Sequence, residues 1–430
     1  MLRRKFSKSI SAEGKRGVQN SLYLAMASLL TKVITFIGFI YIPNRLGVHD
    51  FGIYSIALSF VALFFVFGFG GISKVIIRES IKDKKGIKRF FNKIFNFKLI
   101  LSITQLILIF ITAALTYSYD TELLIIILVA SNEAIFRALK SIPSAILQAK
   151  EEIKTLAKID VTHGLVRVSG MSLLLFIVNN LLYMMIYMSI VNLLFLYIYY
   201  KSMNRLVDYD FSINLRNIGI PSKYFKQGFV FTLIGVGGML TTKIDVVMLS
   251  FLSSIEDVGV YGLSEKIILQ FEMARGMLLI AFYPIVVKYF HKNKARLQSL
   301  FYLTGAIFLS VTILAVIYAN LSEKIIYLLF SDSYKMAAEI TTVLCFYLVF
   351  QFSNIPFSIA LQSTGLEKSI LYMYPFSITI NIILNYYFFN IMGVIGLAYS
   401  TLIVQGFVFL YLMILGSYKL KKEGFINVYK

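Results

Sequence analysis

The segment QSLFYLTGAIFLSVTILAVIYAN, residues 298–320, contains no Asp, Glu, Lys, Arg or His. As a helix rising 1.5 Å per residue, a segment of this length crosses the roughly 30 Å hydrocarbon core of a bilayer. Similar apolar segments recur along the 430-residue chain, which is 58% hydrophobic and only 15% charged. Soluble domains are roughly 45–50% apolar and 25% charged, so a water-soluble fold is excluded. Because lipid offers no partners to the backbone, the spans must be helices, and the chain is an all-α polytopic membrane protein.

Apolar segments separated by short polar gaps predict about twelve transmembrane helices in two six-helix lobes. We expect the N-terminal lobe to cover residues 1–204, and the C-terminal lobe with its cytoplasmic tail to cover residues 205–430. The expected spans are 19–43, 52–72, 97–117, 121–147, 159–178, 181–201, 228–252, 258–287, 298–320, 337–362, 369–390 and 393–416.

Basic residues set the expected orientation. The net charge of +20 comes from Lys and Arg concentrated in the N-terminal arm, in the gaps after even-numbered spans and in the C-terminal tail. Lys and Arg favour cytoplasmic loops, so both termini are expected on the cytoplasmic side of a bacterial inner membrane. This distribution accounts for the positive charge better than nucleic-acid binding, and we expect no nucleic-acid partner.

The two groups of six expected spans carry matching motifs, which indicates an internal duplication. LGVHDFGIY at 46–54 and SIEDVGVY at 254–261 share Asp-x-Gly-x-Tyr, and Ile-Pro precedes Leu-Gln at Pro143 and again at Pro356. Equivalent spans six apart cross in the same direction, so the repeat predicts a pseudo-two-fold axis along the membrane normal and a central cavity. The motif residues have a plainer interpretation, as a tight turn at Asp and Gly and a helix kink at each proline.

Charged residues inside spans are the candidate functional residues, because each costs roughly 2.5–3.5 kcal/mol to insert into a bilayer. Lys32 and Lys243 lie near the middles of equivalent spans and are expected to be unpaired. A cavity rich in such cations would attract a phosphate or diphosphate. The predicted cationic substrate site consists of Lys32, Lys243, Arg137, Arg275 and Lys266. The candidates for ion coupling are Asp245, Glu133 and Glu272.

Helical spacing leaves a structural alternative open for two pairs. Glu133 and Arg137 are spaced i,i+4, while Glu272 and Arg275 are spaced i,i+3, so each pair could neutralise itself on its own helix. Lys140, Arg167 and Lys266 have no acidic partner at such a spacing. Asp245 follows Lys243 by two residues and therefore points elsewhere on the helix surface.

The chain resembles the polysaccharide-biosynthesis flippases of the multidrug/oligosaccharidyl-lipid/polysaccharide exporter superfamily over nearly its whole length. The resemblance rests on LGVHDFGIY at 46–54, Arg-Glu-Ser at 78–80, and Ile244-Asp245 leading to VGVY at 258–261. It implies a MATE-like fold and alternating access between two lobes. The implied substrate is an undecaprenyl-diphosphate-linked oligosaccharide, moved to the outer leaflet for O-antigen or capsule synthesis. Membrane lipids, a polysaccharide polymerase and a chain-length protein are the implied partners.

Three alternatives to a flippase remain open. One is an ion-coupled multidrug antiporter of the same superfamily, for which Asp245 would be the coupling residue. Another is a membrane-embedded polymerase or glycosyltransferase, although the outward gaps are short for a catalytic loop. The third is a scaffold that transports nothing. With one cysteine, Cys345, and three scattered histidines, we expect no enzyme activity, no metal site and no cofactor, apart from coupling to H⁺ or Na⁺.

Overall fold

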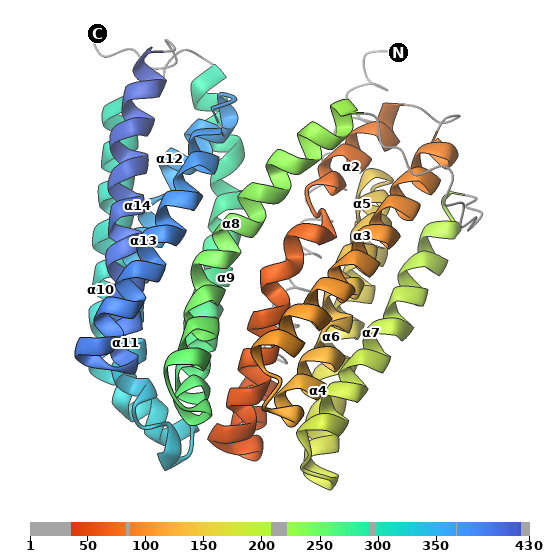
Figure 1. Cartoon of the computed structure of the whole chain (residues 1–430). Coiled ribbons are helices and arrows are strands. Elements are labelled where there is room, and N and C mark those ends of the chain that lie inside the picture. Colours follow the sequence, from red (N-terminus) through yellow and green to blue (C-terminus); the bar gives the residue numbers. More distant parts are fainter. Residues whose placement is uncertain (1–35, 83–86, 208–221, 292–296, 367, 423–430) are drawn as a thin grey trace, which may run out of the picture. The chain divides into compact units, whose positions relative to one another are not determined.

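The computed structural model describes residues 36–82, 87–207, 222–291, 297–366 and 368–422 (Figure 1). Every regular element in these ranges is helical. Eight of the described helices are long and apolar enough to cross a bilayer, counting the continuous stretch Phe36–Gly68 as one. The prediction of an all-helical, multi-pass membrane protein is therefore confirmed. The exact count of twelve spans and their six-plus-six grouping stay predictions.

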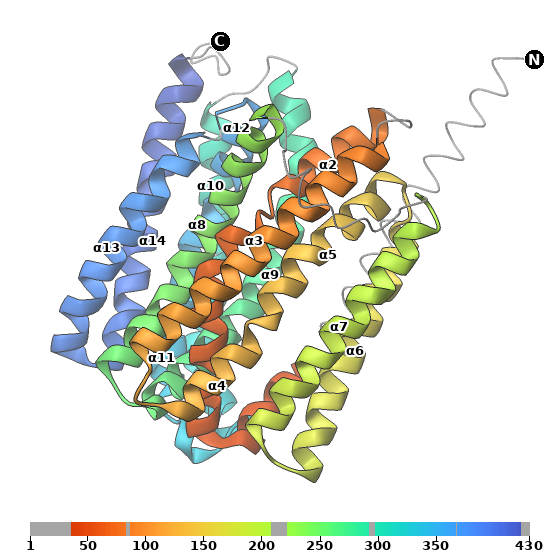
Figure 2. The same ribbon diagram turned by 45° about the vertical axis from the view of Figure 1, so that its right-hand side comes forward.

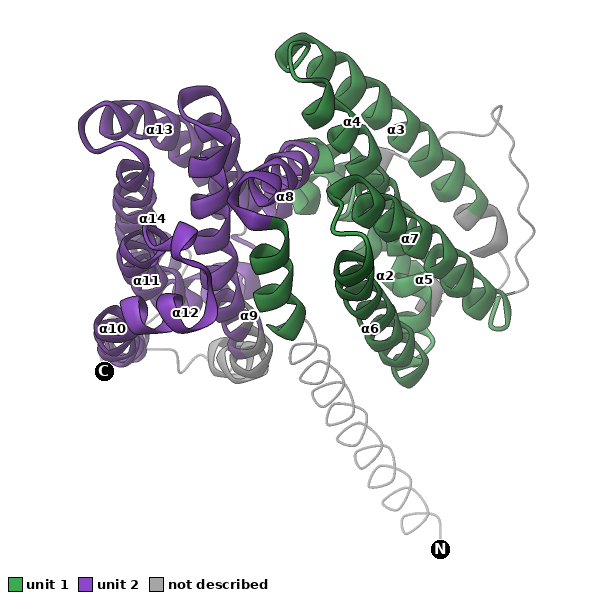
Figure 3. Ribbon diagram, turned by 90° about the horizontal axis from the view of Figure 1, so that it is seen from below, with its two compact units in different colours: residues 1–46, 64–232 green, residues 47–63, 233–430 purple. Residues whose placement is uncertain are grey.

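Packing contacts divide the chain into two compact units (Figure 3). Unit 1 comprises residues 1–46 and 64–232, and unit 2 comprises residues 47–63 and 233–430. The second expected span, 52–72, is therefore divided: residues 52–63 are grouped with the C-terminal half and residues 64–72 with unit 1. The chain enters unit 2 at Gly47, whose φ of +77° interrupts regular right-handed helix geometry. Glycine tolerates this conformation because it has no Cβ.

Unit 1 is built around α5, which packs against α2, α3, α6 and α7. Figure 2 shows α6 and α7 side by side. The α7 N-terminus is capped by Asn180, whose side chain accepts a hydrogen bond from the Tyr183 amide. Besides helical residues 36–46, the helices of this unit are η1 (Phe64–Gly68), α2 (Ile72–Lys82), α3 (Ile87–Thr116), α4 (Thr121–Ala130), α5 (Asn132–Ala149), α6 (Ile153–Ile177), α7 (Leu181–Asn204) and the first part of α8 (Ser222–Leu252).

Unit 2 is built around α11, which packs against α9, α10 and α14, while α13 packs along α14. Gly393, with a φ of +64°, forms the turn between α13 and α14. Besides the rest of α8 and helical residues 47–63, the elements of this unit are α9 (Ile255–His291), α10 (Leu297–Leu329), η2 (Asp332–Tyr334), α11 (Ala337–Ser353), α12 (Ile355–Ser363), α13 (Lys368–Met392) and α14 (Val394–Lys422).

The two matching prolines have different effects on their helices. At Pro356 the expected span is broken, because α11 ends at Ser353 and α12 begins at Ile355. Pro143, in contrast, lies inside the continuous helix α5, and the break in that span lies at Ser131. Of the two prolines, therefore, only Pro356 coincides with a break between helices. A proline lacks the amide that would bond four residues back, and here the freed Leu139 carbonyl accepts a hydrogen bond from the Tyr200 hydroxyl at 3.1 Å.

Both copies of the Asp-x-Gly-x-Tyr motif lie in unit 2, where they pack against each other. A Cβ on Gly52 would lie 2.1 Å from the Ile255 carbonyl oxygen, and a Cβ on Gly259 would lie 2.1 Å from the Val48 carbonyl oxygen. The contact is therefore reciprocal. Each glycine is required because the backbone of the other copy occupies the space of a side chain, a role beyond the expected turn chemistry.

Candidate functional site

In unit 1 the buried carboxylate of Glu133 is shared by two arginines. Oε1 accepts a hydrogen bond from Arg137 Nε at 3.0 Å, and Oε2 lies 3.4 Å from Arg167 Nη1. The predicted i,i+4 pair is thus confirmed, and Arg167 has a partner that helical spacing did not indicate. Two guanidinium groups against one carboxylate leave a surplus positive charge. The Arg137 side chain is 60% exposed and stacks over the Phe65 ring at 4.8 Å, so its outer nitrogens are accessible.

Neutral polar groups extend this network into the core of unit 1. Asn192 donates from Nδ2 to Glu133 Oε2 at 3.0 Å, and its Oδ1 lies 3.1 Å from His163 Nε2. The His163 ring lies between Phe136 and Phe195, with 4.9 Å between ring centroids on each side. The packed His163 ring holds the Asn192 amide in place, and this amide donates to the Glu133 carboxylate.

Two further lysines of unit 1 are held by neighbouring helices. Lys140 lies 2.7 Å from Asp160 Oδ1, an oxygen that also accepts the Tyr199 hydroxyl. Lys98, which is completely buried, donates to the Ala138 carbonyl at 3.0 Å and to the Ser141 hydroxyl. Lys98 was not among the candidates because it lies close to the expected end of its span.

In unit 2, Lys243 does not fit the expectation of an unpaired cation. Its Nζ lies 2.6 Å from Glu265 Oε1 on α9, and both side chains are largely buried. Glu265 is 22 residues away in sequence, so only the packing of α8 against α9 reveals the pair. The expectation that Lys243 is unpaired is therefore wrong, which weakens the charge-based argument for Lys243. Its equivalent, Lys32, lies outside the described residues.

Lys266, which follows Glu265, lies over aromatic rings. Its Nζ is 3.9 Å from the centroid of Tyr54 and 4.2 Å from that of Phe51, both in the first copy of the duplicated motif. Cation–π contacts of this kind stabilise an ammonium group away from water. Lys266 is thereby positioned beside the motif contact.

Arg275 and Glu272 lie on α9 but do not form the ion pair that their spacing allows. Arg275 Nε donates to the Gln351 carbonyl at 3.0 Å, while Glu272 accepts the Tyr347 hydroxyl at 2.7 Å. Among the described side chains no ion pair joins these two residues. The interpretation of a self-neutralising pair is wrong here, because both groups find partners on α11.

Asp245 on α8 is buried at 2% exposure and is held by neutral groups. Oδ1 accepts from Asn385 at 2.8 Å, and Oδ2 accepts from Thr401 at 2.5 Å and from Tyr261 at 3.0 Å. No Lys or Arg in the described ranges pairs with it. As expected from the i,i+2 spacing, Asp245 does not neutralise Lys243. Tyr261 is the tyrosine of the second Asp-x-Gly-x-Tyr copy, so the motif contributes directly to this site.

Three buried polar atoms on α13 and α14, the helices that supply Asn385 and Thr401 to Asp245, have no hydrogen-bond partner among the described residues: Asn385 Oδ1, Asn381 Nδ2 and the Ser400 hydroxyl. Asn381 Oδ1 accepts from Asn385 Nδ2 at 3.2 Å. Buried polar atoms are normally satisfied, so the unpartnered Asn385 oxygen beside a buried carboxylate makes this cluster a candidate site for a proton or a small cation.

The sequence contains a signal for this cluster in its polar residues. Asn381 and Asn385 are spaced i,i+4 in an apolar segment, and Thr401 lies in the next helix. Polar residues on one face of a transmembrane helix indicate a shared partner. Which acid they contact depends on the packing of α8, α13 and α14. In the described ranges, no group of three or more His, Cys, Asp or Glu residues forms a metal site.

The chain belongs to the family of polysaccharide biosynthesis proteins, whose match covers residues 18–290, more than half of its length. No curated protein matches the chain.

Solved structures show the MATE-like fold. The chain is similar to the lipid II flippase MurJ in an inward closed conformation, with 17% identity, a TM-score of 0.74, and coverage of 94% of this chain and 90% of MurJ. It is also similar to an outward-facing multidrug resistance MATE family transporter of the MOP superfamily, with 14% identity, a TM-score of 0.64, and coverage of 94% and 96%. A third similar structure is a MOP superfamily transporter from Pyrococcus furiosus, with 14% identity, a TM-score of 0.63, and coverage of 94% and 95%. At these identities the likeness concerns the fold.

Proposed function

We propose that the protein is a transporter that flips an undecaprenyl-diphosphate-linked oligosaccharide from the cytoplasmic to the outer leaflet of the bacterial inner membrane, by alternating access. Its product would feed surface polysaccharide synthesis, such as O-antigen or capsule, with a polymerase and a chain-length protein as partners. Family membership and the fold shared with a lipid II flippase support this class of activity. We propose no enzymatic step, since the chain would move its substrate without breaking a bond.

The observation that carries the substrate proposal is the surplus positive charge at Glu133. One carboxylate serves Arg137 and Arg167, and the Arg137 guanidinium remains accessible. Guanidinium groups bind phosphate oxygens in a bidentate manner, and at membrane depth such a contact is only weakly screened by salt. We therefore propose Arg137 as the first contact of the diphosphate. Lys32, Lys243, Arg275 and Lys266 stay proposed members of the cationic site, Lys243 with the weakest support because Glu265 neutralises it.

Asp245 is the proposed coupling residue. Its carboxylate is buried, accepts only from neutral donors and contacts Asn385, whose Oδ1 has no donor, so a proton or Na⁺ would supply the missing positive charge. Glu133 fits this role less well because two arginines already neutralise it. Glu272, which accepts the Tyr347 hydroxyl, is a secondary candidate.

The test is flipping of a lipid-linked oligosaccharide in vesicles that contain the purified protein. Arg137→Gln should slow flipping at least tenfold, and the exposed Lys324→Gln should not. Asp245→Asn should abolish the dependence on an imposed H⁺ or Na⁺ gradient, whereas the exposed Glu339→Gln should preserve it. Unchanged flipping by the Arg137 variant would exclude the proposed anion contact.

A multidrug antiporter is the second candidate, and the observation that favours it is the buried Asp245 carboxylate, which pairs with no Lys or Arg among the described residues. The same vesicles distinguish the two. Gradient-driven uptake of a cationic dye that requires Asp245, together with no movement of glycan lipid, would select the antiporter.

A further inference from the structure

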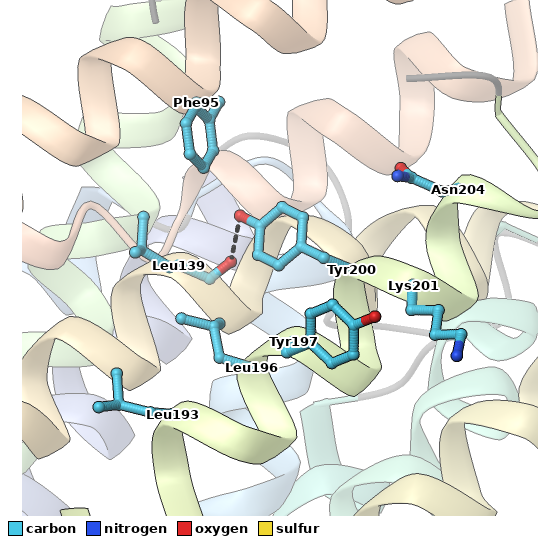
Figure 4. Close-up of a pocket in the computed structure, with 8 residues that line it drawn as sticks. All are labelled: Phe95, Leu139, Leu193, Leu196, Tyr197, Tyr200, Lys201 and Asn204. Atoms are coloured by element: carbon cyan, nitrogen blue, oxygen red, sulfur yellow. Dashed lines mark hydrogen bonds between the residues drawn. The ribbon is translucent and has the colours of Figure 1, made fainter. Parts of the chain in front are cut away.

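Unit 1 contains a groove that none of the proposed transport residues line. It has a volume of about 440 Å³ and lies between α3, α5 and α7 (Figure 4). This volume falls in the roughly 300–1,000 Å³ range of ligand sites. The lining residues are Phe95, Leu139, Leu193, Leu196, Tyr197, Tyr200, Lys201 and Asn204.

The two sides of the groove differ in polarity. Figure 4 shows Leu193, Leu139 and Phe95 toward one side, and the polar atoms of Tyr197, Lys201 and Asn204 spread along the other. The Tyr200 hydroxyl, although part of the lining, is occupied by the Leu139 carbonyl. The groove therefore combines an apolar trough with one polar, basic side.

The outer wall of the groove faces lipid. Ile190, Leu193, Tyr197 and Lys201 follow one another at spacings of three and four residues, so they form one stripe on α7. Their apolar members are strongly exposed, at 59% for Ile190, 53% for Leu193 and 63% for Tyr197. In a membrane-spanning helix, exposed apolar side chains contact acyl chains. The stripe thus leads from the hydrocarbon region into the groove.

Lys201 lies where a headgroup phosphate would be. It is three residues before the end of α7, at the interface end of a span, and the ring of Tyr197 lies 5.9 Å from its Nζ. Tyrosine is typical of the membrane interface. α3 and α7 contain no Asp or Glu, and within the described ranges no carboxylate pairs with Lys201. The charge at this end is complementary to an anion.

We propose that this groove binds an anionic phospholipid, with one acyl chain along Leu193 and Leu196 and the phosphate on Lys201. A basic residue at the membrane surface attracts an anionic headgroup, and basic pockets between transmembrane helices bind such lipids. The lipid would fill the space between α3, α5 and α7 and stabilise unit 1. The proposal does not depend on which substrate is transported.

The test is native mass spectrometry of the purified full-length chain in detergent, titrated with phosphatidylglycerol or with phosphatidylcholine of the same acyl chains. The wild type should bind phosphatidylglycerol about five-fold more tightly, the contribution expected of one lysine. Lys201→Gln should remove this preference, and the exposed Lys154→Gln on α6 should retain it. Leu193→Trp fills the trough and should weaken the binding of both lipids. Leu173→Trp, at a similarly exposed position on α6, should weaken the binding of neither.

Four outcomes would overturn the proposal. The first is equal binding of the two lipids by the wild type, and the second is an equal effect of Lys201→Gln and Lys154→Gln. The third is displacement of phosphatidylglycerol by undecaprenyl phosphate at lower concentration, which would assign the groove to a substrate tail. The fourth is a change in oligomeric state with Leu193→Trp at unchanged lipid binding, which would make this face a contact between copies of the chain.

Discussion

The two units each bury a carboxylate, but they satisfy it in different ways. Glu133 of unit 1 has two arginines as partners, while Asp245 of unit 2 accepts only from hydroxyl and amide donors. Breaking a buried ion pair leaves an uncompensated charge, so Glu133 is tied to the stability of its unit. Removing the Asp245 charge, in contrast, leaves no described cation without its partner. The comparison separates an acid paired with two cations from an acid held only by neutral donors, which is the one proposed for ion coupling.

The largest expected effect is therefore a difference in stability between two similar substitutions. Glu133→Gln should destabilise the protein by about 3 kcal/mol, because Arg167 loses its partner inside the unit. Asp245→Asn should change the stability by less than about 1 kcal/mol, because the amide oxygen can still accept from Thr401 and Tyr261, and the amide nitrogen can donate to the unpartnered Asn385 Oδ1 once the Asn385 amide turns over. Unfolding by denaturant in detergent micelles measures both. Equal losses would show that the two acids play the same structural role.

A second difference is that both copies of the duplicated motif lie in unit 2. Gly52→Ala and Gly259→Ala each place a methyl group against a carbonyl oxygen of the other copy, and each should cost about 1–3 kcal/mol by overpacking. Gly70→Ala in unit 1, with open space around its Cβ position, is the control. The same unfolding assay applies. If only one motif glycine is sensitive, the contact is not reciprocal.

The two prolines provide a smaller, local test. Tyr200→Phe removes the donor to the carbonyl that Pro143 leaves free, and should cost about 1 kcal/mol. In a Pro143→Ala background the alanine amide can bond the same carbonyl, so Tyr200→Phe should cost less there. A double-mutant cycle measured by unfolding gives the coupling between these sites. Additive effects would mean that Tyr200 does not compensate for the proline.

The smallest expected effect concerns an exposed pair beside the two motif copies. His49 Nδ1 donates to Glu256 Oε1 at 2.8 Å, and this hydrogen bond is the largest cause that lowers the pKa of the Glu256 carboxyl. The pair should therefore contribute stability above the ordinary pKa of a glutamate and lose it as the pH falls through the lowered value. NMR titration of Glu256 in the wild type and in His49→Ala measures the change. We expect the pKa to rise in the variant, and an unchanged pKa would exclude the contact in solution.

Patterns of local origin were predicted well from the sequence. Apolar segments of bilayer length identified the helices, and α-helical spacing identified the Glu133–Arg137 pair, because both depend only on neighbours along one helix. The duplicated motifs were recognised, but their reciprocal contact was not, since it joins residues some 200 positions apart. Pro143 shows the limit of a local rule: the same dipeptide lies at a helix break at Pro356 and inside a continuous helix at Pro143, where the Tyr200 hydroxyl bonds the freed carbonyl.

Composition and periodicity were enough to establish that this chain is a bundle of membrane-crossing helices, because the bilayer imposes length and backbone pairing on every span separately. Which charged residues of the site are paired depends on how the helices pack. Lys243 found Glu265, Arg167 found Glu133, and Asp245 found no cation in the described ranges, each through contacts between helices distant in sequence. A lone charge and a paired charge look identical in a sequence. The Coulomb energy between two charges depends on their distance in space, and only the tertiary structure sets that distance.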